Sequence, residues 1–257
     1  MSLTSAVLKV AAPVPRLESF TKYLFIGPHP DDIEIGAGAC AAKLSAQGKQ
    51  VSFLICLDGR FGMENAPEGT KPEDLIRIRK QECIASAAVL GVSDVHFLGL
   101  SDGGLYRRKD LLKGIARVIG EVRPEVIFAP DPAVSSECHA DHLNVGMAAR
   151  QFAFFAPFEE IMKKYGARSA PVQAIAYYMT AKPNRFIGTT GGAFSRQTEA
   201  IRCHASQFPE GCEALRSVEL YLKIRAVDFG LRSFKGKAEG FRVLGRTQMH
   251  CLPEAGE

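Results

Sequence analysis

The sequence predicts an α/β fold, a Rossmann-like three-layer sandwich built around a mostly parallel sheet. Short apolar segments of strand length alternate with longer helix-like segments along most of the 257 residues, which is the pattern of βαβ units. The apolar segments are nearly continuous, as in QVSFLICL at residues 50–57, and strands covered by helices on both faces have this composition. With 46% hydrophobic and 23% charged residues, the chain resembles an ordinary globular domain.

The first ninety residues supply two strand–helix pairs. Prolines interrupt helix formation near the start, so residues 1–20 are expected to be an irregular lead-in. The segment YLFIG predicts a strand at 23–27, and a run of small residues ending at a glycine predicts a helix at 37–47. The apolar run at 50–57 predicts the second strand. A longer amphipathic segment at 72–90, which begins with proline and stops at glycine, predicts the second helix.

The same alternation continues through the middle of the chain. Residues 94–98 (DVHFL) predict a third strand, and residues 111–122 predict a helix. A proline then restricts the backbone before a fourth strand at 126–129. The next helix is expected at 139–155, so the segment between the fourth strand and this helix is a candidate for ligand contacts.

The last hundred residues alternate less regularly. AIAYYM at 174–179 predicts a fifth strand, and residues 197–206 and 213–229 predict two more helices. The sequence contains no evident domain boundary. We therefore expect one domain over residues 1–257, with residues from about 157 onward forming a cap or a C-terminal extension of it.

Charge, cysteine usage and hydropathy exclude several classes of protein. The net charge of +4 is too weak and too scattered to indicate nucleic-acid binding. No apolar run approaches the roughly 20 residues of a membrane helix, and the N-terminus lacks the pattern of a secretory signal. The seven cysteines are widely spread without a Cys-x-x-Cys pair, which indicates reduced thiols and a cytoplasmic protein.

The first chemical cluster directly follows the first predicted strand, in GPHPDDIE at residues 27–34. It places His29 close to the adjacent carboxylates Asp31 and Asp32. In open parallel sheets, ligands bind beyond the carboxyl ends of the strands. Aspartates also cap helices well, so this cluster taken alone could equally be the start of a helix.

The second cluster, CHADH at residues 138–142, follows the fourth predicted strand. Two histidines and a carboxylate, with water in the fourth position, form many catalytic zinc sites, and His29, Asp32 and His142 could supply this set. Iron or manganese would also accept these ligands. Asp31 could then act as a base, and Asp141 or His139 could orient a neighbouring imidazole. A plain helix start is again the alternative, but two such clusters at strand ends of one sheet favour a site.

These motifs resemble the LmbE/PIG-L-like zinc-dependent de-N-acetylase superfamily. PHPDD at 28–32 and HxDH at 139–142 carry the resemblance, together with DGxxG at 58–62 and the His-x-Ser-Gln pattern within EAIRCHASQF at 199–208. FAPDP at 128–132, YYMTAKPN at 177–184 and EGFRV at 239–243 look closest to the diacetylchitobiose deacetylase branch. The family has an acidic residue directly after Asp-Asp, whereas here Ile33 precedes Glu34.

The resemblance implies a metal site and its acid–base groups. His29, Asp32 and His142 match the zinc ligands, and Asp31 matches the general base. His139 matches the histidine that assists the intermediate and protonates the leaving amine.

The resemblance also implies orienting and substrate-contacting residues. Asp141 matches the residue that orients a histidine, and we expect it to keep His139 cationic. Arg79 and Asp102 match positions that contact sugar hydroxyls. His250 matches a late histidine that can complete the site of a neighbouring subunit, and family resemblance therefore also implies a homo-oligomer.

The sequence thus predicts a zinc-dependent hydrolase that removes the acetyl group from an N-acetylglucosamine-type sugar or glycoconjugate. The substrate would be a small molecule, and neither nucleic acid nor membrane is an expected partner. De-N-acylation of another amino-sugar conjugate, such as a thiol-cofactor precursor or an antibiotic intermediate, is the alternative activity. A non-catalytic sugar- or nucleotide-binding regulator is the alternative of another class.

Overall fold

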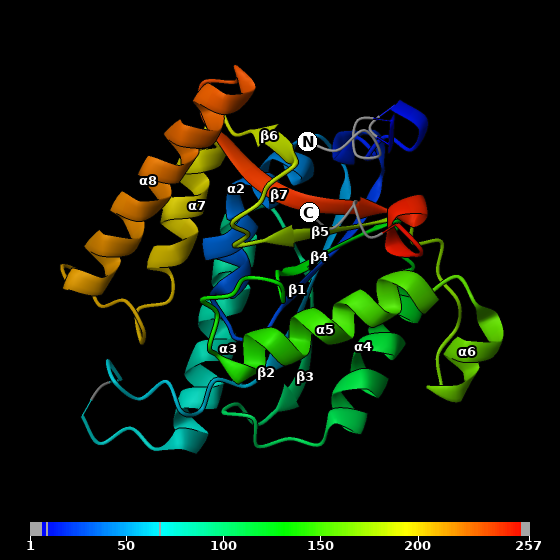
Figure 1. The fold of residues 1–257 in the computed structure, drawn as a ribbon. Coiled ribbons are helices and arrows are strands. Elements are labelled where there is room, and N and C mark those ends of the chain that lie inside the picture. Colours follow the sequence, from blue (N-terminus) through cyan, green and yellow to red (C-terminus); the bar gives the residue numbers. More distant parts are fainter. Residues whose placement is uncertain (1–6, 9, 67, 253–257) are drawn as a thin grey trace.

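The computed structural model describes residues 7, 8, 10–66 and 68–252 (Figure 1). Its strands are β1 (Lys22–Gly27), β2 (Gln50–Leu57), β3 (Asp94–Leu100), β4 (Val126–Pro130), β5 (Ala174–Tyr178), β6 (Arg185–Gly188) and β7 (Ala238–Gly245). Its helices are α2 (Asp32–Ala46), α3 (Pro72–Val89), α4 (Arg108–Val122), α5 (Ala140–Phe155), α6 (Glu159–Lys164), α7 (Ala193–Arg202) and α8 (Glu213–Ser233). Short 3-10 helices occur at Leu17–Ser19 and Arg246–Met249.

The seven strands form one sheet in the order β3-β2-β1-β4-β5-β7-β6. Strands β1 to β5 run parallel to one another, whereas β7 runs antiparallel to both β5 and β6. The prediction of an α/β fold with a mostly parallel sheet is therefore confirmed. Residues after 157 contribute three strands to this same sheet.

Helices cover both faces of the sheet, which gives three layers (Figure 1). Tyr23 and Phe25 of β1 pack with α2, α3 and α7 on one side. Leu24 and Ile26 pack with α4 and α5 on the other side. Successive side chains of a strand point to opposite faces, so a central strand buried on both faces must be apolar throughout.

Several predicted boundaries were wrong. Helix α2 begins at Asp32 rather than at residue 37, where Ala37 has non-helical dihedral angles and marks a kink. Helix α7 covers 193–202 rather than 197–206, because turns occupy the segment that follows it. Residues 7, 8, 10 and 11 are helical, so the lead-in is not wholly irregular, although the helix does stop before the prolines.

Three elements were not predicted: α6, β6 and β7. Strand β7 contains Glu239 and Arg242, whose charges interrupt the apolar pattern. Both side chains are nevertheless accommodated, since Glu239 accepts hydrogen bonds from the backbone N–H groups of Ala39 and Cys40 and Arg242 pairs with Asp131.

The order of the strands determines where ligands can bind. From β1 the chain continues to β2 and β3 toward one edge of the sheet, and from β4 it continues to β5 toward the opposite edge. The strand order therefore reverses between β1 and β4, which is the topological switch point. Residues 28–32 follow β1 and residues 131–142 follow β4. The two sequence clusters therefore meet at the carboxyl edge of the sheet.

Among the described residues, we find no helix with both the length and the apolar character needed to cross a membrane.

Candidate active site

The loop after β1 delivers three side chains to the carboxyl edge. His29 and Asp32 are buried, and Asp32 is the first residue of α2. Asp31 occupies the capping position of this helix, but its side chain makes no capping hydrogen bond. Capping of α2 therefore does not explain Asp31, because its carboxylate binds another partner.

The two histidines each have one ring nitrogen held by a carboxylate. Nε2 of His29 lies 3.1 Å from Oδ2 of Asp141, and Nδ1 of His142 lies 3.0 Å from Oε2 of Glu137. Their other nitrogens point to the same carboxylate, since Nδ1 of His29 is 3.2 Å from Oδ2 of Asp32 and Nε2 of His142 is 3.4 Å from Oδ1. The free nitrogens of both rings thus converge on Asp32.

This arrangement fits a divalent metal ion. One donor atom from each of His29, Asp32 and His142 lies within 4.8 Å of the others. Two ligands bound about 2.0–2.1 Å from a tetrahedral ion are roughly 3.3 Å apart, close to the observed 3.2 and 3.4 Å. Carboxylates that hold the remote nitrogens of metal-bound histidines are a regular feature of zinc sites.

The close carboxylates also change the proton affinities of these groups. Burial alone would lower the pKa of His29, but hydrogen bonds to Asp141 and Asp32 outweigh it and raise the pKa to about 10. The pKa of His142 is raised to about 9, because its hydrogen bond to Asp32 outweighs burial. Burial would raise the pKa of Asp32, but the two histidines hold it well below the usual range.

Asp31 lies beside this set and is held by Arg79. Its backbone has φ = 135°, an uncommon and strained value for a residue with a side chain. Nη2 of Arg79 donates to Oδ2 of Asp31 at 3.0 Å and to the carbonyl oxygen of Pro30 at 2.9 Å. Burial raises the pKa of Asp31, opposed by the charge of Arg79. The side chain of Arg79 thus supports the conformation that presents Asp31.

The position of Arg79 also explains why residue 59, in the loop after β2, is a glycine. Its Nη1 donates to the carbonyl oxygen of Gly59 at 3.1 Å. Gly59 has a positive φ of 71°, and a Cβ atom there would lie 2.4 Å from Nη1. Only glycine leaves space for the guanidinium group, whose two terminal nitrogens donate to Gly59, Pro30 and Asp31 while its buried Nε has no hydrogen-bond partner among the described residues.

The expectation that Asp141 keeps His139 charged does not match the contacts. Asp141 accepts hydrogen bonds from His29 and from the backbone N–H groups of Gly103 and Gly104, at 2.7 and 2.8 Å. His139 lies 3.9 Å away and instead caps α5, since its Nδ1 accepts the backbone N–H of Asp141. The oxygens of Asp141 are occupied, so this carboxylate primarily orients His29.

A cavity of about 300 Å³ lies beside these groups. Its lining residues come from the segments after β1, β2, β3 and β4, from α3 and from the segment after α7: His29, Asp31, Phe61, Gly62, Arg79, Asp102, Gly103, His139, Asp141 and Gln207. Asp102 is buried, and its Oδ2 accepts the backbone N–H of Phe61. Oδ1 of Asp102 is also buried, but it has no hydrogen-bond partner among the described residues. It is therefore available to a polar ligand group.

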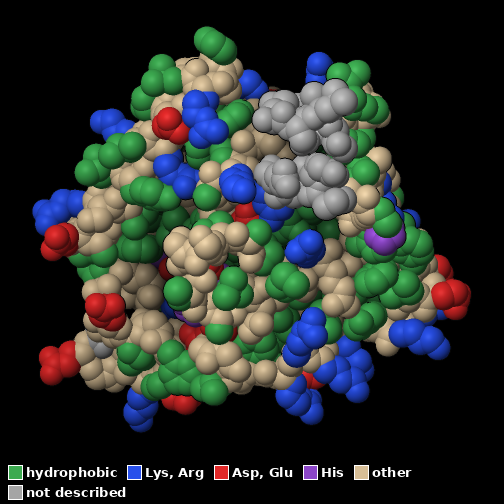
Figure 2. Space-filling model, viewed as in Figure 1, with side chains coloured by type: hydrophobic (Ala, Val, Ile, Leu, Met, Phe, Trp, Pro, Cys, Tyr) green, Lys and Arg blue, Asp and Glu red, His purple; other side chains and the backbone are tan. Residues whose placement is uncertain are grey.

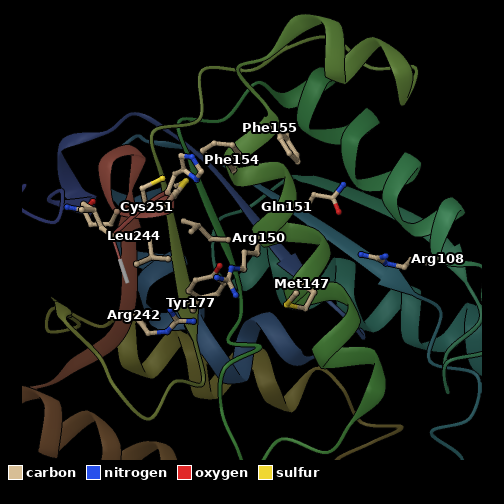
Figure 3. A pocket seen from close by; sticks show the side chains of 15 residues that line it. Arg108, Met147, Arg150, Gln151, Phe154, Phe155, Tyr177, Arg242, Leu244 and Cys251 are labelled. Atoms are coloured by element: carbon tan, nitrogen blue, oxygen red, sulfur yellow. The ribbon is translucent and has the colours of Figure 1, made fainter. Parts of the chain in front are cut away.

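His250 is the one predicted site residue that the structure places elsewhere. Its ring packs against Phe154, with the centroids 5.4 Å apart, and it lines a separate cavity of about 620 Å³ between α5 and β7 (Figure 3). Phe154 lies near the end of α5, whereas His142 lies at its start, roughly 20 Å away at 1.5 Å per residue. His250 therefore cannot contact a ligand in the cavity of its own chain.

Sequence reasoning missed two contributors to the site. Glu137, which fixes His142, precedes the HxDH motif by two residues, and an acid so close to ligand histidines was a usable signal. The N–H groups of Gly103 and Gly104 could not have been predicted, because backbone donors depend on how the loop folds.

The sequence left the roles of Glu34 and His204 open. Both are fully buried behind Asp31, with Nε2 of His204 3.4 Å from Oε1 of Glu34. Ser86 donates a hydrogen bond to the same oxygen, and Gln197 donates to the backbone carbonyl of Glu34 at 2.9 Å. This polar cluster joins α2, α3 and the segment after α7, so it supports the helix that carries Asp32.

Comparison with known proteins places this fold and site in a defined class. Residues 24–153 match the model of the PIG-L family, described as GlcNAc-PI de-N-acetylase. This segment includes both clusters, and the chain belongs to that family.

Individual relatives indicate a narrower group of enzymes than the family model does. The chain is 33% identical to diacetylchitobiose deacetylase from Thermococcus kodakarensis, over 91% of this chain and 87% of that protein. It is 29% identical to 1D-myo-inositol 2-acetamido-2-deoxy-alpha-D-glucopyranoside deacetylase from Kineococcus radiotolerans, over 68% of this chain and 55% of the relative. The structure resembles N,N'-diacetylchitobiose deacetylase from Pyrococcus horikoshii, with a TM-score of 0.84, 28% identity, and coverage of 98% and 97% of the two chains.

Proposed function

We propose that this protein is a metal-dependent deacetylase that hydrolyses the acetamide of a small N-acetylglucosamine-type sugar. One observation carries the proposal: the free nitrogens of His29 and His142 converge on Asp32, with the carboxylate of Asp31 beside them. Two relatives that match 91% and 98% of this chain are both named as diacetylchitobiose deacetylases. Water adds to the acetyl carbon, the carbon–nitrogen bond breaks, and acetate and a free amine are released.

We assign the metal to His29, Asp32 and His142, with zinc as the first choice because two imidazoles and one carboxylate suit it. When bound, such an ion polarises a carbonyl group and lowers the pKa of water. Asp141 and Glu137 keep the histidines in the required orientation. Other divalent transition metals accept the same ligands.

The remaining residues move protons and hold the sugar. Asp31 takes a proton from the attacking water as the general base. His139 lines the cavity with its side chain about half exposed. As an imidazolium, after taking up a proton, it gives that proton to the departing nitrogen. The unpaired Oδ1 of Asp102 accepts a hydrogen bond from a sugar hydroxyl. Arg79 acts on the reaction by positioning Asp31.

The test combines metal analysis of the purified protein with detection of the amine freed from N-acetylglucosamine, diacetylchitobiose and other N-acetylated sugar conjugates. We expect about one bound ion per chain, amine release that a chelator abolishes, and recovery on adding zinc. Release only from a different conjugate would change the substrate but keep the chemistry. A protein that binds sugar without releasing amine would be a binding module.

His250 would act only in the site of a neighbouring copy, which requires a homo-oligomer. The seven cysteines form no disulfide, and we propose a cytoplasmic location on that basis. If His250 acts in a neighbouring copy, a mixture of inactive Asp31→Asn and His250→Ala subunits regains activity, because some sites combine two intact halves.

A further inference from the structure

Helix α8 is apolar on two opposite faces. Helix α8 contacts β6 and β7. Its inner face buries Leu215, Leu222, Ala226 and Phe229, and the two leucines pack with Ile201 of α7. Its outer face is exposed and carries apolar side chains whose exposed fractions are 59% for Leu220, 60% for Ile224, 41% for Val227 and 72% for Leu231. The inner face accounts for how the helix binds to the sheet, but the outer face needs another explanation.

The exposed apolar residues are concentrated on this helix. Of the thirteen large apolar side chains that are exposed among the described residues, six belong to α8 and its cap: the four above, Tyr221 and Phe234. Figures 1 and 2 show α8 along the left edge of the molecule, with apolar side chains along that edge. The six expose on the order of 600–700 Å², above the largest patch of a typical monomer.

The spacing of these residues is that of a coiled-coil seam. Leu220, Ile224, Val227 and Leu231 follow one another at intervals of four, three and four residues, the alternation of core positions in a heptad. Such a row keeps one line along a helix and packs against an equivalent row on a second helix. A row of this kind is self-complementary, so a second copy of this chain is the simplest partner.

The charges beside the seam favour a parallel pair. Lys223 precedes Ile224 on one side, and Asp228 follows Val227 on the other. In a parallel coiled coil, Lys223 faces the flanking position five residues further on in the partner helix, which is Asp228. By symmetry Asp228 faces Lys223 of the second copy, so the contact occurs twice per dimer. In an antiparallel pair, Lys223 and Asp228 would lie on opposite sides of the seam and could not meet.

We propose that two copies of this chain associate through the outer face of α8, with the helices parallel and in register. The six side chains together expose slightly less than the roughly 800 Å² that each partner contributes to a standard interface, and four of the six form the seam. Because the area lies slightly below that value and the seam is short, we expect a dissociation constant in the micromolar range. The pairing does not depend on the chemistry of the active site.

The first test measures mass by analytical ultracentrifugation from about 1 to 100 μM. We expect the wild type to associate, and Ile224→Glu to reduce the mass twofold at the same concentration while amine release per chain is unchanged. Lys223→Glu and Asp228→Lys each place like charges opposite one another and should weaken association about fivefold to tenfold. The double variant restores opposite charges and should return to within about twofold of the wild type.

The second test fixes the orientation. In the parallel register, residue 227 faces residue 227 of the second copy, so Val227→Cys should form a disulfide-linked dimer under mild oxidation, identified as a 227–227 link by peptide mapping. Arg232→Cys, on the same helix but off the seam, is the control and should not link. A wild type that stays monomeric at 100 μM, or an Ile224→Glu variant of unchanged mass, overturns the proposal. A missing 227–227 link overturns the parallel register.

Discussion

Replacing Asp31 with asparagine separates proton transfer from metal binding. The amide has the same size as the carboxylate, and its oxygen can still accept the hydrogen bond that Arg79 donates at 3.0 Å. The metal donors are His29, Asp32 and His142, so the variant should keep its ion. Only the ability of residue 31 to take a proton is lost.

The expected magnitude follows from that single loss. A positioned general base contributes about 10²–10⁴-fold to a hydrolytic rate, which corresponds to about 3–5 kcal/mol of activation free energy. We therefore expect kcat for amine release to fall by this factor in Asp31→Asn, with KM changed little. The acid limb that Asp31 gives the wild-type pH profile should disappear in the variant.

The assay is steady-state amine release across pH, with the metal content measured on the same preparations. Asp32→Asn is the matched control, because it changes the neighbouring carboxylate in the same way and should lose the ion. If Asp31→Asn retained its metal and worked within about threefold of the wild-type rate, Asp31 would not be the base. Loss of the ion from Asp31→Asn would instead make it a ligand.

Three further predictions concern the groups around the site. Arg79→Ala should lower kcat about 10–100-fold without loss of metal, because the strained Asp31 loses its support. Arg79→Lys should recover only part of the rate. A change confined to KM would instead make Arg79 a sugar contact. Zinc binding to the metal-free protein at pH 7 should release about two protons, because the pKa values of His29 and His142 are about 10 and 9. Affinity should accordingly rise with pH from 6 to about 9, as measured by calorimetry in buffers of different ionisation enthalpy, and binding without proton release would contradict these values. His204→Ala should lower the free energy of unfolding by about 3 kcal/mol in urea titrations, because it leaves a buried carboxylate unpaired, and a loss below about 1 kcal/mol would argue against the buried pair.

The central strands could be predicted because their environment is nearly uniform. Strands β1, β2 and β4 lie inside the sheet with helices on both faces, so their sequences are almost continuously apolar. Strand β7 is different, because the charges of Glu239 and Arg242 are satisfied by partners distant in sequence. A local pattern contains no information about such partners, and the strand was therefore missed.

The sequence by itself determined which donors the site can use, because His29 and Asp32 closely follow the first apolar strand and His142 stands in the first turn of the helix that follows the fourth. The tertiary structure decided how those donors are used. Folding turned Asp141 toward His29 instead of His139, used the donors of Arg79 to hold Asp31, and placed His250 at the far end of α5. Residue types and short-range spacing are local properties, whereas the partner of a buried charge depends on which distant segments pack together.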